Sequence, residues 1–246
     1  MPILSYRIAS ISGPNEFSTT GALDGHLSAI VKSDHEEAIA QVYSEIAANR
    51  LAIFLGIPVA TGVPAYLEDG DHSIKYASLR ASERNHDFYD FTSDDSRENS
   101  DHHPEMKKLS VDFPNEVSQI AVFDYWIGNE DRELNFKAEL SKKDRGVIFA
   151  LDHGNSLLSC ASTITKSLEK LQNTDFPSFH LFDDYIDMHY AKIMIDRINQ
   201  IPEWAIENAV VMNDVVGSVI LSDQYALYEV LIRRKLYLEN QLKKML

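Results

Sequence analysis

Two short polar segments in the middle of the chain carry the residue types that phosphoryl transfer needs. Asp131 and Asn135 follow an apolar stretch, and Asp152 directly follows the strand-like run 147–151. Phosphoryl transfer requires one carboxylate to orient the attacking hydroxyl, and an amide oxygen with a second carboxylate to hold Mg²⁺ against the nucleotide phosphates. The spacing therefore predicts Asp131 as a catalytic residue, and Asn135 and Asp152 as the residues that bind Mg²⁺ and ATP.

The block from Phe123 to Gly154 runs from an apolar helix through a polar loop and an apolar strand to an Asp-x-Gly turn. It resembles the HipA-like kinase family, especially its small stand-alone members. These carry Trp-x-x-Asn-x-Asp-Arg and a later Asp-His-Gly, as in 126–132 and 152–154 here. The resemblance covers most of the chain. It implies ATP-dependent transfer to a Ser or Thr hydroxyl of a protein substrate, and it leaves room for a regulatory partner protein.

The loop departs from the usual kinase spacing in one respect. Protein kinases place the asparagine five positions after the catalytic aspartate, whereas Asn135 follows Asp131 by four. Either the loop is one residue tighter, or Asn135 is not the second metal ligand. Asn129 and Asn155 lie close enough in the sequence to replace it.

Lys32 and Glu45 match a second pair of kinase residues. Lys32 ends an apolar strand, and Glu45 lies on the amphipathic helix expected over 39–54. Kinases use a strand lysine to contact the nucleotide phosphates and a helix glutamate to orient that lysine. We therefore expect Lys32 to bind ATP and Glu45 to hold Lys32. Glu36 and Glu37 compete for the glutamate role, but they lie at the helix start, where acidic residues serve the helix dipole.

The expected fold class is α+β, a two-lobed protein-kinase-like fold that forms one kinase-like domain. A small β-rich lobe with one helix covers 1–80, and a larger, mostly helical lobe covers 81–246. The resemblance places the connection between lobes near 76–80, where backbone groups of Ala77 and Leu79 would meet the adenine of ATP. An acidic segment poor in apolar residues, 83–108, is expected to be a solvated loop. Helices are expected over 115–127, 182–201 and 225–246.

Other polar residues near these segments are assigned supporting or no roles. Arg132 is expected to pair with an acidic neighbour and support the loop, and His153 to be a packed side chain. The histidines of the acidic segment and its surroundings receive no metal role, because no helix or strand is expected to fix their geometry; they are His72, His86, His102 and His103.

Composition limits the partners and the compartment. The 246 residues include 38 acidic and 23 basic residues, a formal net charge of −15. This charge disfavours direct binding to nucleic acid or to an anionic membrane. No apolar run approaches the length of about 20 residues that spans a bilayer, and Cys160 is the single cysteine, which excludes an internal disulfide. We therefore expect a cytoplasmic location.

Two alternative functions remain open at this point. A kinase of a lipid or small molecule is one, because phosphoinositide kinases share the Asp-Arg loop. The other is a degenerate kinase fold that binds a nucleotide or a protein without catalysis. The short spacing from Asp131 to Asn135 and the lack of a G-x-G-x-x-G loop favour this reading, since Gly13, Gly21 and Gly25 are scattered.

Overall fold

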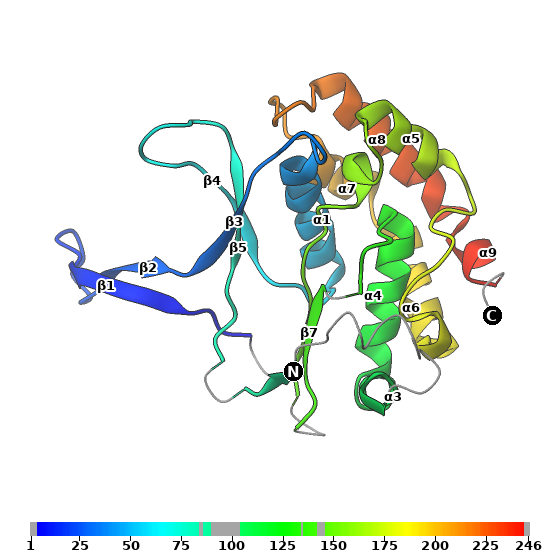
Figure 1. Cartoon of the computed structure of the whole chain (residues 1–246), viewed down its shortest axis with the longest axis horizontal. Coiled ribbons are helices and arrows are strands. Elements are labelled where there is room, and N and C mark those ends of the chain that lie inside the picture. The colour runs from blue at the N-terminus through cyan, green and yellow to red at the C-terminus, as the bar shows by residue number, and fades with distance from the viewer. Residues whose placement is uncertain (1–3, 84–85, 90–103, 134, 142–145, 244–246) are drawn as a thin grey trace.

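The computed structural model describes residues 4–83, 86–89, 104–133, 135–141 and 146–243. Among these residues, those up to Tyr89 form six strands and one helix, and those from Pro104 onward form mostly helices (Figure 1). In this part of the chain no helix is long and apolar enough to cross a lipid bilayer.

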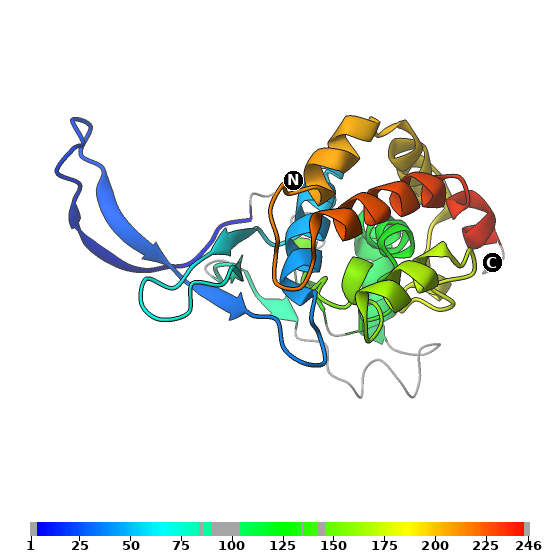
Figure 2. The same ribbon diagram turned by 90° about the horizontal axis from the view of Figure 1, so that it is seen from above.

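Five strands form two small antiparallel sheets at the N-terminal end. The strands β1 (Ile8–Pro14) and β2 (Leu23–Leu27) pair as a two-stranded ribbon. The ribbon projects away from the helices in both views (Figures 1 and 2). The second sheet has the order β3-β5-β4, formed by β3 (Ala29–Lys32), β4 (Gly62–Ala65) and β5 (Lys75–Leu79). The middle strand of this sheet is therefore β5.

Helix α1 (Gln41–Leu55) follows β3 and lies in the main core. It ends at Gly56, which has a left-handed φ of 71° and donates its N–H to the carbonyls of Ala52 and Ile53. Glycine takes this conformation at little cost, so it terminates the helix. Because α1 contacts β4 and β5 on one side and α7 and η2 on the other, it connects the sheet to the helical part.

A third sheet lies between these parts and carries the polar segments expected to do chemistry. Its order is β6-β7-β8, with β6 (Phe88–Tyr89), β7 (Phe136–Glu139) and β8 (Ile148–Ala150) all antiparallel. All three residues of β8 are buried. The loop with Asp131 enters this sheet through β7, and the turn with Asp152 leaves it from β8.

Helix α4 (Pro114–Ile127) is central to the helical part, where it contacts α3, α6, α8 and α9. Its side chains from Val117 to Ile127 are all buried. The other elements are α3 (Pro104–Asp112), η2 (Leu157–Ser159), α5 (Ile164–Gln172), η3 (Asp183–Tyr185), α6 (Met188–Gln200), α7 (Glu203–Val210), α8 (Leu221–Lys235) and α9 (Leu238–Lys243).

Several element boundaries differ from those expected. The acidic segment 83–108 contains β6 and the start of α3, so the loop prediction is wrong there, while 84–85 and 90–103 lie outside the described residues. The helix expected over 182–201 begins only at Met188, because the Asp187 carboxylate caps it by accepting the His189 N–H. The C-terminal helix is divided into α8 and α9. Neither β7 nor α5 was among the expected elements.

Candidate active site

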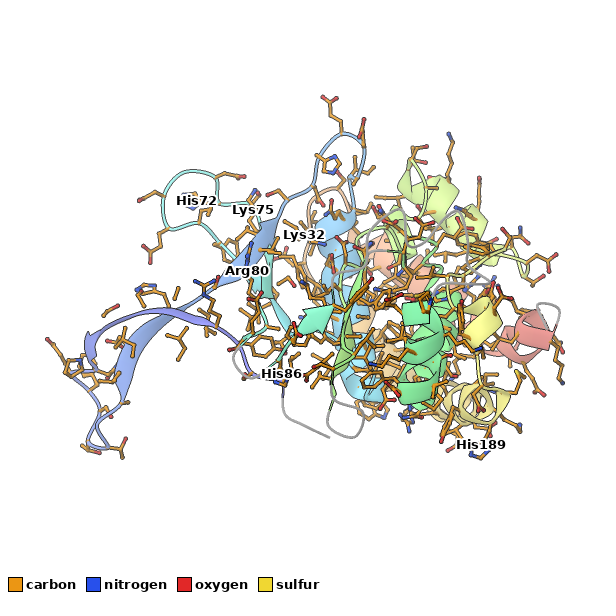
Figure 3. The ribbon with its side chains drawn as sticks, turned by 60° about the horizontal axis from the view of Figure 1, so that its bottom comes forward. Lys32, His72, Lys75, Arg80, His86 and His189 are labelled. Carbon is orange, nitrogen blue, oxygen red and sulfur yellow. The ribbon has the colours of Figure 1, made fainter. Side chains whose placement is uncertain are left out.

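Lys32, Glu45 and Asp152 meet in one cluster of charges. The Lys32 ammonium lies 2.5 Å from Glu45 Oε1 and 2.6 Å from Asp152 Oδ1. Figure 3 shows Lys32 where the sheet meets α1. The structure thus brings the strand lysine to Glu45 in the body of α1, and one cation bridges a helix carboxylate and the carboxylate that follows β8.

Burial makes the three charges depend on one another. The Glu45 side chain is 1% exposed, and burial raises its pKa to about 7 against the opposing charge of Lys32. Burial would also lower the pKa of Lys32, but the two carboxylates outweigh it and raise that pKa above its usual value. Lys32 therefore stays charged and supplies the counter-charge of the buried Glu45 carboxylate, whose Oε2 also accepts the His153 N–H at 3.2 Å.

The turn after β8 holds Asp152 in an unusual conformation. Asp152 has a φ of 48°, and its Oδ1 accepts the N–H of Gly154 at 3.3 Å. A Cβ atom at Gly154 would meet Gln41 Cγ of α1 at 2.8 Å, so the glycine allows the turn to pack closely against α1. Burial would raise the pKa of Asp152, but Lys32 outweighs it and lowers that pKa, so the side chain is an ionised carboxylate.

Asn135 folds back onto Asp131 in spite of the short spacing. Its Nδ2 donates to the backbone carbonyl of Asp131 at 2.6 Å, and its backbone N–H donates to the carbonyl of Arg132 at 3.0 Å. The Asp131 N–H in turn donates to Oδ1 of Asn129 at 3.0 Å. Since the Asn135 amide nitrogen is the donor, its Oδ1 atom is the one that can bind a metal or accept a hydrogen bond.

Arg132 connects this loop to the Asp152 turn through hydrogen bonds. Its Nε and Nη2 donate to the two oxygens of the Asp124 carboxylate at 2.7 and 2.8 Å, and its Nη1 donates to the carbonyls of Asn135 and Leu151. The Leu151 N–H also donates to the Asn135 carbonyl at 2.8 Å. The expected pairing of Arg132 with an acidic neighbour is confirmed, and it sets Asn135 beside the residue that precedes Asp152.

Asp124 is fully buried and accepts two further hydrogen bonds. One comes from Asn129 Nδ2 at 3.0 Å and one from His180 Nε2 at 2.9 Å. The Phe182 N–H donates to His180 Nδ1, so the ring proton lies on Nε2. Burial would raise the pKa of Asp124, but the charge and hydrogen bonds of Arg132 hold it well below its usual range.

A direct contact joins the two segments. Nδ2 of Asn155, in the turn after Asp152, donates to Oδ2 of Asp131 at 2.6 Å. The carboxylate of Asp131 is exposed, and its second oxygen is not engaged by any hydrogen bond recorded among the described residues. The structure therefore brings Asp131 to the same turn as Asp152.

A cavity of about 180 Å³ lies beside the charged cluster, between the β3-β5-β4 sheet and the β6-β7-β8 sheet. Its residues come from both sheets; the apolar ones include Ile30, Leu79, Phe88, Phe149 and Leu151, and Arg80, Glu83 and Lys137 are charged. Ile30 precedes Lys32 by two positions on β3, and Leu151 precedes Asp152. The cavity lining thus includes residues that lie close in the sequence to Lys32 and Asp152.

The structure does not bring Ala77 to this cavity. Ala77 lies in the middle strand β5, in register with Val31 on one side and Val63 on the other. The backbone groups of a central strand are used by its neighbours, so Ala77 has none left for an adenine edge. Leu79 does line the cavity, at the point where the chain leaves the sheet toward Arg80.

The histidines stay outside the charged cluster or serve in packing. His153 is buried edge-on against Phe123, and burial lowers its pKa to about 3, so it is a neutral packed side chain as expected. His72 and His86 lie apart from each other in Figure 3, and His102 and His103 lie outside the described residues. Within the described ranges, no group of three or more His, Cys, Asp or Glu side chains could hold a metal ion.

The fold defined by these elements is that of the protein-kinase-like proteins. Solved structures with this fold include those of CtkA and HipA. A Helicobacter pylori proinflammatory kinase, CtkA, matches with a TM-score of 0.57 and 15% identity over 95% of both chains. HipA of Shewanella oneidensis, solved in a complex with HipB and operator DNA, matches with a TM-score of 0.56 and 12% identity over 94% of this chain and 68% of its own.

The model of the HipA-like kinase family matches residues 21–185. The chain therefore belongs to the HipA-like kinase family. No curated protein sequence matches the chain.

Proposed function

We propose that this protein is an ATP- and Mg²⁺-dependent phosphotransferase that acts on a Ser or Thr hydroxyl of a protein. One observation carries the proposal: Lys32 bridges Glu45 and Asp152, while Asn155 joins Asp131 to the same turn. Membership of the HipA-like kinase family supports phosphotransfer in general. The single cysteine supports a location in the cytoplasm.

Nucleotide binding would use the cavity and the charged cluster together. The apolar walls from Ile30, Leu79 and Phe149 suit a flat base. Lys32, held by Glu45, would bind phosphate oxygens and give up its contact with Asp152 as they arrive. We place the division between the two lobes near residue 80, where the chain leaves β5 beside this cavity.

The residues around Asp152 fit Mg²⁺. Asp152 offers a carboxylate that is 38% exposed, and Asn135 offers its amide oxygen, because its Nδ2 is the atom bonded to the Asp131 carbonyl. Mg²⁺ is usually bound by one or two carboxylates together with substrate phosphates rather than by a cage of protein ligands, which suits this pair. When bound, Mg²⁺ supplies positive charge that offsets the phosphate oxygens.

Asp131 would act on the acceptor. Its carboxylate orients the hydroxyl and takes its proton, while the hydroxyl oxygen bonds to the γ-phosphorus and the bond from that phosphorus to the bridging oxygen of ADP breaks. The exposure of Asp131 allows a large substrate to reach it. A protein hydroxyl is therefore our first choice of acceptor, and a regulatory partner protein is part of the proposal only by family resemblance.

Incubation with γ-labelled ATP, Mg²⁺ and candidate protein substrates tests the proposal. We expect label transfer that Asp131→Ala and Asp152→Ala abolish, and that Asp196→Ala, an exposed residue of α6, leaves intact. Label on small molecules but on no protein would support the alternative of a small-molecule or lipid kinase. Nucleotide binding without transfer would support a binding module, and no nucleotide binding would refute every kinase reading.

A further inference from the structure

Asn155 supports the proposed function through its bond to Asp131, but that function gives the Asn155 side chain no role of its own. It lies three positions after Asp152, and its Nδ2 donates to Asp131 Oδ2 at 2.6 Å across 24 positions of the chain. It is thus a side-chain connection between the turn expected to hold the metal and the carboxylate expected to act on the acceptor.

Both ends of this hydrogen bond rest on fixed parts of the protein. Next to Asn155, the N–H and Oγ of Ser156 both donate to the His153 carbonyl, at 3.1 and 2.7 Å, and Ser156 and His153 are buried. At the other end, the Asp131 N–H donates to the buried Asn129. The Asn155 amide therefore meets the Asp131 carboxylate from an anchored turn, although both side chains are exposed.

The chemistry of the amide group limits how Asn155 can act on Asp131. An amide nitrogen donates but cannot take a proton, so Asn155 does not compete with Asp131 as a base. It occupies Oδ2 and leaves Oδ1 for the acceptor hydroxyl. We infer that Asn155 is a positioning residue that fixes the orientation of the Asp131 carboxylate for phosphoryl transfer. The inference rests on the proposed function, because that function assigns the acceptor to Asp131.

A different role for the same side chain would be that of a metal ligand through its amide oxygen. One substitution separates the two roles. In Asn155→Asp a metal ligand would be preserved, since carboxylate oxygens suit Mg²⁺. A positioning residue would be lost, because the variant removes the donor and sets a like charge against Asp131.

Steady-state kinetics of Asn155→Ala and Asn155→Asp measure this role. We expect kcat to fall about tenfold in the alanine variant, as for a lost hydrogen bond to a charged group, and further in the aspartate variant. The KM for ATP and the Mg²⁺ dependence should stay within about twofold of the wild type. Asn208→Ala, at an exposed asparagine of α7, is the matched control.

Three outcomes would overturn the inference. They are an unchanged kcat in Asn155→Ala, activity restored by Asn155→Asp, and a fall in kcat accompanied by an equal rise in KM and a lower melting temperature. The last of these would show a structural role alone.

Crystal structures of the wild type and of Asn155→Ala, each with Mg²⁺ and a non-hydrolysable ATP analogue, add a readout that does not depend on turnover. We expect the Asp131 carboxylate to turn away from its wild-type orientation in the variant. If the wild type transfers no phosphate, the proposed function fails, and these structures still decide the inference. The same Asp131 orientation in both would refute it.

Discussion

Arg132 and Asp124 form a fully buried, two-pronged ion pair, with Arg132 Nε and Nη2 at 2.7 and 2.8 Å from the two carboxylate oxygens. The remaining nitrogen of the guanidinium, Nη1, donates hydrogen bonds to the carbonyls of Asn135 and Leu151. One side chain therefore keeps the Asp131 loop and the Asp152 turn in register. The stability of the protein and the geometry of the site depend on the same pair.

The Asp124→Asn variant should lose about 3 to 5 kcal/mol of unfolding free energy at pH 7, because it leaves a buried guanidinium without its counter-charge. The pKa of Asp124 is lowered in the folded state. Its contribution to the unfolding free energy is therefore present above the unfolded pKa of 3.8 and is lost as pH falls below that value. Urea titrations at pH 7 and at about pH 3, which lies below the unfolded value, would measure both effects. A loss no larger than that of Asp196→Asn, whose partner Lys192 is exposed, would contradict this role.

The Glu45→Gln variant should lose activity, and its stability should depend less on pH than that of the wild type. We expect kcat/KM to fall about 10- to 100-fold through loss of the charged hydrogen bond to Lys32. Burial raises the pKa of Glu45 to about 7. The stabilisation that protonated Glu45 contributes to the folded state is therefore complete below its unfolded pKa of about 4.5 and is lost as pH rises through 7. The wild type should lose more unfolding free energy than Glu45→Gln between pH 5 and pH 8.

Denaturant titrations at both pH values, together with label transfer, check this prediction. The same change at Glu229, which is 64% exposed in its pair with Arg233, is the control and should alter neither property. Equal pH slopes in the wild type and Glu45→Gln would show that Glu45 titrates as an ordinary exposed carboxylate.

The Gly217→Ala variant should be destabilised by at least about 2 kcal/mol more than Gly21→Ala. Both glycines have positive φ, 58° and 76°, so alanine costs backbone strain at each. A Cβ at Gly217 would also meet Asp34 Oδ2 at 1.9 Å, whereas nothing lies within 4 Å of one at Gly21. Asp34 accepts the Val42 N–H at the start of α1, so the variant should also weaken nucleotide binding. Thermal unfolding of the two variants is the measurement, and equal losses would contradict the contact.

The Cys160 thiol should react slowly with iodoacetamide at pH 8. Burial raises its pKa from 9.0 to about 11, so the thiolate fraction in the folded protein is about 100-fold lower than in the unfolded chain. Labelling followed by mass spectrometry, with and without urea, would measure the ratio, and glutathione in the same solutions corrects for the effect of urea on the reagent. Equal corrected rates would show that the thiol is accessible and ordinary.

The sequence predicted long periodic elements well and short ones poorly. The helix expected over 39–54 is α1, because its apolar spacing is regular and Gly56 can adopt the left-handed end. Helix α3 was missed, since only Met106 and Leu109 of its nine residues are buried and too few apolar positions mark it. Strand β7 is only four residues long, so Phe136 and Ala138 give too short an alternation to predict.

The grouping of candidate site residues was predictable where residue type and chain order carried the signal. Lys32, Glu45 and Asp152 are adjacent in the structure because a strand, a helix and a turn meet in that order. The contact of Asn155 with Asp131 depends on the shapes of two loops, which spacing does not encode. The middle position of β5, which takes Ala77 away from the cavity, depends on strand order, which the sequence leaves open.

The β1–β2 ribbon contributes no residue to either hydrophobic core, and every residue of β2 is exposed. An isolated pair of strands is only marginally stable in water. Its hydrogen bonds can therefore break and re-form without loosening α1 or α4, and amide protons of the ribbon should exchange with deuterium long before those of the buried helices. Substitutions in the ribbon should consequently leave the melting temperature of the protein unchanged, and only assays that report on ligands or partners should detect their effects.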